Sequence, residues 1–176
     1  MLAHPILLKF RADNLVRALG AKPEDEGPRR KLQTDVSPLR EFDLQKVEFP
    51  DAWLKRLDAR AVDFFKANLR KASLREAFLS KAVFYETNLQ EAILCGADLT
   101  EANLSNANLH KADLRDADLR QANFRQACLT EVKLNGAKVA GADVREVQWG
   151  MNPDGYVDVS PSGDGSQMKT VRAWIQ

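Results

Sequence analysis

Apolar residues recur at every fifth position along about half of this chain. From Phe64 to Trp149, eighteen positions spaced by five are all apolar: twelve Leu, three Phe, two Val and one Trp. We call these positions the centres. Two residues before each centre, fourteen of the eighteen positions hold Ala. Because 44% of the chain is hydrophobic, an unbroken run of centres has a chance probability of roughly 10⁻⁶ to 10⁻⁷, and the period is real.

A five-residue period fits neither regular helix nor straight strand. On a helix, five residues turn the side chain through about 500°, so successive centres lie about 140° apart. On a straight strand, a step of five moves the side chain to the opposite face. The pattern therefore predicts a chain that changes direction once per pentad, with the Ala and the centre both pointing inward. A degenerate form of the pattern continues back to Phe42, which gives 22 units over residues 42–149.

The three remaining positions of each pentad are mostly polar. The residue between the Ala and the centre is most often Asp or Asn, whose side chains hydrogen-bond the local backbone in turns. The two residues after the centre are mostly charged or hydroxylic, and we expect them to face water. The Ala position predicts a tight inward slot, because larger residues rarely occur there.

Tandem A-[DN]-L-x-x units, clearest over residues 102–116, resemble the pentapeptide-repeat family. They read Ala102-Asn103-Leu104, Ala107-Asn108-Leu109 and Ala112-Asp113-Leu114. The resemblance implies an all-β fold, a right-handed quadrilateral parallel β-helix with four pentads, hence about twenty residues, per coil. We assign residues 42–149 to this β-helix. Residues 1–41 are predicted to form a non-repeat segment with a short helix that caps one end, and residues 150–176 a C-terminal cap or tail.

A coil of this size sorts the inward residues into columns. Three Phe centres fall in one column, where we expect their rings to pack in the core along the rod axis. Four Leu centres spaced by twenty are predicted to stack in another buried column. These four are Leu74, Leu94, Leu114 and Leu134.

The same sorting places a few apolar residues on the outside. Phe65 and Tyr85 are twenty residues apart and should stack one above the other, with Val83 on the same face and Phe78 at the preceding corner. These four residues form our candidate interaction patch. Either the N-terminal segment covers the patch, or the patch binds a protein partner, because large exposed apolar surfaces mark interaction sites.

Charge and cysteine content restrict the partners and the compartment. The net charge is +1, and residues 62–149 hold twelve basic and twelve acidic residues, so we expect no direct nucleic-acid binding. No apolar run is long enough for a membrane span, and the N-terminus does not resemble a secretory signal, so no membrane association is predicted. Cys95 and Cys128 lie on different outward rows and are not expected to form a disulfide. A reducing cytoplasmic location fits this best.

No motif indicates catalysis. The two histidines, His4 and His110, have no carboxylate and nucleophile arranged around them by spacing. Phosphate-binding glycine loops and zinc-type Cys/His spacings are absent from the sequence. The acidic residues of the tail, Asp154, Asp158 and Asp164, do not match a calcium-binding loop. We therefore predict a non-enzymatic protein with no metal and no cofactor.

Two functions remain. The first is a protein-interaction or scaffold module whose rigid β-helix presents a surface to a protein partner. The alternative, implied by the quinolone-resistance members of the family, is a DNA mimic that binds and protects type II topoisomerase. That function would require a strongly acidic rod and a C-terminal apolar segment that pairs two rods. This rod is charge-balanced. The tail's apolar residues fit either a dimer seam or a cap, so a monomer or a dimer through a terminal segment is expected.

Overall fold

The computed structural model describes Leu39 and residues 44–149. The predicted N-terminal helix and cap, the predicted C-terminal cap or tail, and the expected cover of the patch by residues of the N-terminal segment all lie outside the described residues.

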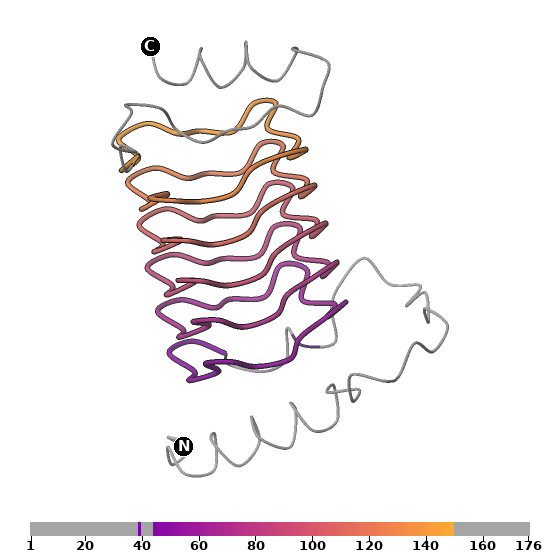
Figure 1. The fold of residues 1–176 in the computed structure, drawn as a ribbon. Coiled ribbons are helices and arrows are strands. Elements are labelled where there is room, and N and C mark those ends of the chain that lie inside the picture. The colour runs from indigo at the N-terminus through magenta and orange to yellow at the C-terminus, as the bar shows by residue number, and fades with distance from the viewer. Residues whose placement is uncertain (1–38, 40–43, 150–176) are drawn as a thin grey trace.

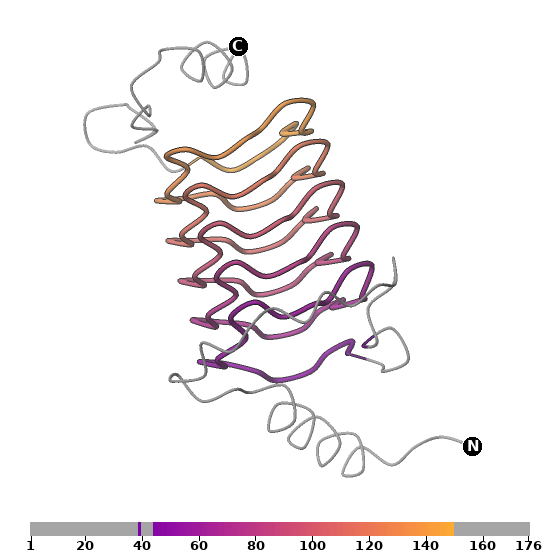
Figure 2. The ribbon, with the colours of Figure 1, turned by 90° about the vertical axis from the view of Figure 1, so that its right-hand side faces the viewer.

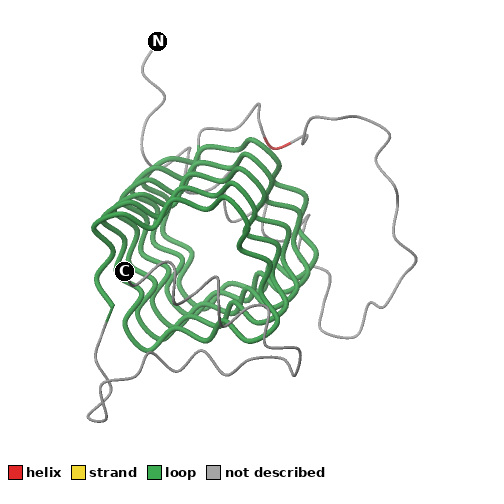
Figure 3. Ribbon diagram, turned by 90° about the horizontal axis from the view of Figure 1, so that it is seen from above, coloured by secondary structure: helices red, strands yellow, loops and turns green. Residues whose placement is uncertain are grey.

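Residues 44–149 wind into a four-sided solenoid of stacked coils (Figures 1 and 2). Parallel bridges join residues that are twenty apart, from Glu48↔Asn68 at one end to Cys128↔Gln148 at the other. The view along the axis shows the coils superposed side on side (Figure 3). The twenty-residue coil and the parallel stacking expected from the family resemblance are therefore confirmed. The right-handed sense stays a prediction.

We number the four sides by the centres of one coil. Face 1 contains Phe84, face 2 Leu89, face 3 Leu94 and face 4 Leu99, and every twentieth residue returns to the same face. We call the residue before each centre the face residue, because it makes the bridge to the coils on either side. Within residues 44–149 each side has only one bridged residue between two turns, so no longer strand forms. Leu39 alone adopts a 3₁₀ conformation.

The second residue after each centre turns the chain through the corner. From Lys46 to Glu146, all twenty-one of these residues have positive φ, between 54° and 61° for the eighteen that are not Gly. Left-handed backbone is costly for residues with a Cβ, by roughly 1–2 kcal/mol each. Gly96, Gly136 and Gly141 occupy this position without that cost.

Main-chain hydrogen bonds between coils follow one scheme in nearly every pentad. In a representative pentad, the N–H of Asn103 donates to the preceding coil, and those of Leu104 and Asn106 donate to the following coil. The N–H of Ala107 donates to the C=O of Leu104 at 3.1 Å, which closes the turn. Four of the five N–H groups are thus bonded to backbone, which buried main chain requires.

The fifth N–H is bonded by the face residue when that residue is Asp or Asn. In the same pentad, the N–H of Ser105 donates to Oδ1 of Asn103 at 3.1 Å. All eleven Asp and Asn face residues of the solenoid accept this bond from the N–H two residues later. The predicted turn role of these residues is confirmed, and its cause is the one donor that the neighbouring coils leave unpaired.

The interior is filled by the centres and the alanines. The rings of Phe64 and Phe84 stack with centroids 5.2 Å apart and planes 4° apart, as the column predicted. The four predicted Leu residues are all buried in one column of face 3. Thr87 takes an alanine position, and its hydroxyl donates to the C=O of Phe64 at 2.7 Å. Among the described residues, no buried polar side-chain atom lacks a hydrogen-bond partner.

Candidate interaction surface

The aromatic pair of the candidate patch stacks on the outside of face 1. The rings of Phe65 and Tyr85 have centroids 5.7 Å apart and planes 7° apart. Both residues follow a centre directly, on successive coils, so the coil repeat places one ring above the other. Both are half-buried, which leaves a continuous aromatic surface open to solvent. The expected stacking of this pair is confirmed.

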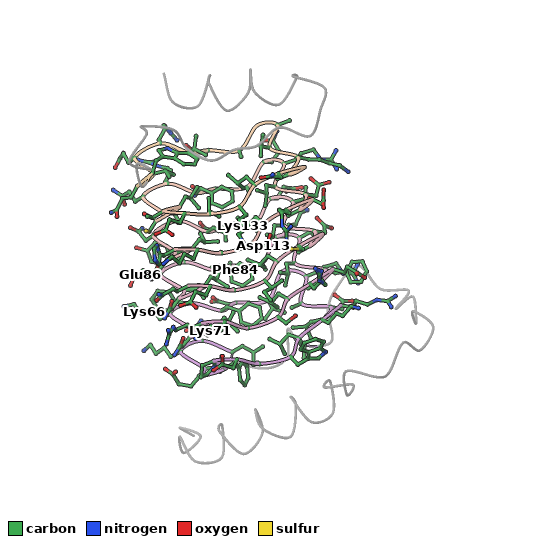
Figure 4. The ribbon with its side chains drawn as sticks, in the orientation of Figure 1. Lys66, Lys71, Phe84, Glu86, Asp113 and Lys133 are labelled. Carbon is green, nitrogen blue, oxygen red and sulfur yellow. The ribbon has the colours of Figure 1, made fainter. Side chains whose placement is uncertain are left out.

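An ion pair borders the two rings at the neighbouring corner. Lys66 Nζ lies 3.1 Å from Glu86 Oε2 and 5.0 Å from the centroid of the Phe65 ring, where a cation is attracted to the aromatic face. Figure 4 shows Lys66 and Glu86 on successive coils at the same edge of the solenoid. A hydrogen bond to Glu86, then the charge of that carboxylate, raises the pKa of Tyr85 above its ordinary value of 10.0. The phenol is therefore neutral at physiological pH.

The other two patch residues occupy face positions. Val83 is the face residue of face 1 and is half-buried beside the aromatic pair. Phe78 is the face residue of face 4 and is 37% exposed. The turn at Ser80 and Lys81 lies between Phe78 and Val83. Three patch residues thus share one face, and the fourth lies in the middle of the adjacent face rather than at its corner.

Two further exposed apolar residues lie on face 3, outside the predicted patch. Trp53 is 47% exposed and Ile93 is 39% exposed. Both are face residues, and each is bridged to Ser73 between them. The signal for Ile93 was its place in a row otherwise rich in Asp and Asn, but Trp53 lies in the degenerate first coil, where the pattern is weaker.

Asp–Arg pairs dominate the remaining polar surface. In four pentads, an Asp face residue accepts two side-chain hydrogen bonds from the Arg two residues later, a bidentate geometry. The pairs are Asp58–Arg60, Asp113–Arg115, Asp118–Arg120 and Asp143–Arg145.

The pKa of Asp113 shows how strongly such a pair is held. Partial burial alone would raise it, but hydrogen bonds from the Arg115 side chain, the Cys95 thiol and the Arg115 N–H lower it to about 2. For Asp143 the hydrogen bond from Arg145 is the largest cause, and its pKa is also lowered to about 2. Both carboxylates are therefore fully ionised at neutral pH.

The predicted chemistry-bearing residues are not brought together. Cys95 and Cys128 are both free thiols, as expected. Burial, then the hydrogen bond to Asp113, raises the pKa of Cys95, so this thiol is protonated and unreactive at neutral pH. His110 lies in an outward turn, and His4 and the acidic residues of the tail lie outside the described residues. In the part of the chain that the structure describes, no three His, Cys, Asp or Glu residues are grouped to hold a metal ion.

The described coils contain no helix of the length and apolarity that crossing a membrane demands.

A four-sided solenoid built from pentads defines a class of repeat protein, and the comparisons identify its family. The family model for pentapeptide repeats matches eight copies over residues 63–100 and 97–136. The crystal structure of the pentapeptide-repeat protein Rfr23 from the cyanobacterium Cyanothece 51142 is 31% identical. The match has a TM-score of 0.59 and covers 60% of this chain and 86% of that one. The chain belongs to the pentapeptide-repeat family.

Two other solved structures illustrate the range of similar proteins. A pentapeptide-repeat protein from the Arabidopsis thaliana thylakoid lumen is 28% identical with a TM-score of 0.40, covering 64% of this chain and 70% of that one. QnrB1, a plasmid-mediated fluoroquinolone resistance protein, is 19% identical with a TM-score of 0.30, covering 60% of this chain and 71% of that one. No curated protein sequence gave a significant match.

Proposed function

We propose that this protein is a non-enzymatic interaction module that presents one side of its β-helix to a protein partner. The surface is the candidate patch of Phe65, Phe78, Val83 and Tyr85. The observation that carries the proposal is the stacked pair of aromatic rings on the outside of face 1, at positions where most other pentads hold polar residues. Aromatic side chains are the residues that most often anchor protein interfaces.

Rigidity of the support strengthens this proposal. The backbone under both rings is hydrogen-bonded to neighbouring coils, with Lys66 N–H donating to the C=O of Tyr85 at 3.1 Å. A surface held in this way loses little conformational entropy when it binds. The free thiols support a reducing, cytoplasmic location as part of the same proposal.

Topoisomerase protection is the less favoured function. A DNA mimic must display an extended acidic surface to a site that binds phosphates. Over residues 44–149 there are sixteen Lys and Arg against fifteen Asp and Glu, and many pair with one another in successive coils, as in Lys111–Glu131. No face of the solenoid is therefore uniformly acidic.

A comparison of two charge-introducing variants tests the proposal. Tyr85→Glu places a carboxylate in the aromatic pair and beside Glu86, which we expect to abolish partner binding. His110→Glu is the matched control, because it changes the same position of the pentad on face 2. Wild-type protein and both variants would be immobilised and used to capture proteins from the native cell extract, with quantification by mass spectrometry.

The decisive result is a protein retained by the wild type and by His110→Glu but lost with Tyr85→Glu. The interaction would then be measured with the purified partner by titration calorimetry, and thermal unfolding would establish that both variants remain folded. Equal capture by all three folded proteins would show that the patch is not the binding surface.

A further inference from the structure

Face 3 carries an apolar strip that is separate from the candidate patch. Parallel bridges link Trp53 to Ser73 and Ser73 to Ile93, so the three side chains follow one another on adjacent coils. Trp53 and Ile93 are among the only three large apolar residues of the described chain that are exposed. Ser73 between them is small and outward-facing, yet only 8% exposed. The larger neighbours therefore shield it, and the strip is continuous over three coils, about 10 Å from first to last.

Unpaired cations line the same face. Of the sixteen Lys and Arg residues in 44–149, only four form no ion pair within the described chain. Three of the four, Lys55, Arg75 and Lys133, lie on face 3, and the fourth, Lys46, lies on face 1. Lys55 and Arg75 each follow the centre directly after Trp53 and Ser73, so they border the apolar strip.

The combination specifies the chemistry of a ligand. An apolar strip favours a large apolar side chain, and an uncommitted guanidinium favours a carboxylate that it can bind with two hydrogen bonds. Elsewhere on the solenoid the cations are already satisfied by acidic neighbours, so a second carboxylate would gain little there. Only face 3 offers exposed apolar surface and unpaired positive charge together.

We propose that face 3 docks a segment of another protein in which large apolar residues are flanked by Asp or Glu. The apolar side chains pack along Trp53, Ser73 and Ile93, and the carboxylates pair with Lys55 and Arg75. A nucleic acid fits less well, because Glu76, Asp113 and Asp116 lie on the same face and would repel phosphates. This surface is two faces away from the aromatic pair, so the inference stands independently of the proposed function.

Selection from a random peptide library identifies the ligand chemistry without knowledge of the partner. Phage displaying twelve-residue random peptides would be selected on the immobilised full-length protein, after removal of phage that bind the Trp53→Asn/Ile93→Asn double variant. Asn suits these positions because it is the residue that many other pentads carry there. We expect the enriched peptides to combine large apolar residues with at least two Asp or Glu.

Synthetic copies of the enriched peptides would then be measured by fluorescence polarisation. We expect Arg75→Glu to weaken binding about tenfold or more, an effect that shrinks as salt is raised. Lys46→Glu is the matched control, because it reverses the other unpaired cation on face 1 and should leave affinity unchanged. Tyr85→Glu should also leave it unchanged, which separates this surface from the candidate patch.

Several results would overturn the inference. These are the absence of any enriched peptide, enrichment of basic or uncharged peptides, and equal binding by the wild type and Arg75→Glu. Binding of a single-stranded oligonucleotide in preference to the acidic peptides would point to a nucleic acid instead. A wild-type protein that binds peptide only after removal of residues 150–176, or that dimerises through face 3 in sedimentation equilibrium, would assign the strip to its own chain.

Discussion

The two halves of the solenoid have the same interior and different exteriors. Residues 44–96 and 97–149 both bury a column of centres and alanines and repeat the same hydrogen bonds between coils. In the first half, however, four of ten face residues are Asp or Asn, whereas in the second half seven of eleven are. All three exposed large apolar residues of the described chain belong to the first half.

This difference separates what the coil requires from what it tolerates. The inward positions define the coil, and both halves keep them. A face residue contributes one local hydrogen bond when it is Asp or Asn, and the coil still forms when it is Phe78 or Ile93. The first half thus gives up local turn hydrogen bonds at positions where it displays apolar side chains. We interpret the first half as the recognition region and the second as the more regular support.

The largest expected effect tests whether the interiors are equivalent. Replacing Ala107 in the second half, or Ala82 in the first, by Phe overfills a fully buried slot. We expect each change to cost on the order of 1–3 kcal/mol or more in the free energy of unfolding. Ser105→Phe is the control, because it adds the same ring at an outward position equivalent to that of Tyr85. Urea unfolding would measure all three, and an Ala107→Phe variant as stable as the wild type would refute the tight slot.

A smaller effect tests the role of the face residues. Asn108→Ala removes the side-chain acceptor for the N–H of His110, a bond of 3.1 Å. We expect a loss of about 0.5–1.5 kcal/mol, the usual net value of one such hydrogen bond. Lys133→Ala changes the same pentad position without removing a described hydrogen bond or ion pair, and should cost less. If both variants lose the same stability in urea unfolding, the Asp and Asn residues do not hold the turns as described.

Acid should weaken the second half, which holds three of the four Asp–Arg pairs. The folded-state pKa of Asp113 is about 2, below its ordinary value of 3.8. The ionised carboxylate therefore stabilises the fold fully above about pH 4, and this contribution is lost as the pH falls toward about 2. Asp113→Asn should show a smaller loss of stability between about pH 5 and about pH 2.5 than the wild type.

Asp116→Asn provides the control for this experiment, since it removes a nearby exposed carboxylate without a described ion pair. Urea unfolding at the two pH values would be compared for all three proteins. Identical pH dependence in the wild type and Asp113→Asn would contradict the assigned role of the Asp113–Arg115 pair.

The smallest expected effect is none, on DNA gyrase. Neither half displays a uniformly acidic surface, so we expect the purified protein to leave gyrase supercoiling unchanged at near-stoichiometric ratios. QnrB1 would serve as the comparison protein in the same assay. Clear protection or inhibition that weakens as salt rises would make topoisomerase binding the favoured function.

The sequence predicted the interior of this fold more completely than its surface. The five-residue period assigned each centre and alanine to the core, because burial depends only on which way a position points. The resemblance supplied the coil length, which placed Phe65 above Tyr85. Contacts between long side chains depend on rotamers as well as position, so the bidentate grip of Arg115 on Asp113 was not predicted. Left-handed corners also escaped notice, although Gly96, Gly136 and Gly141 share one pentad position and signalled them.

The twenty-residue coil also gives every outward residue a compass direction. Each pentad turns the chain by about a quarter of a circle, and four pentads restore the original direction. Loss of one pentad between Ile93 and Asp113 would rotate all later faces by about 90° relative to the earlier ones. Loss of four would shorten the rod and leave every bearing unchanged. The angle between two binding surfaces on this rod is therefore set by the remainder when the number of pentads between them is divided by four.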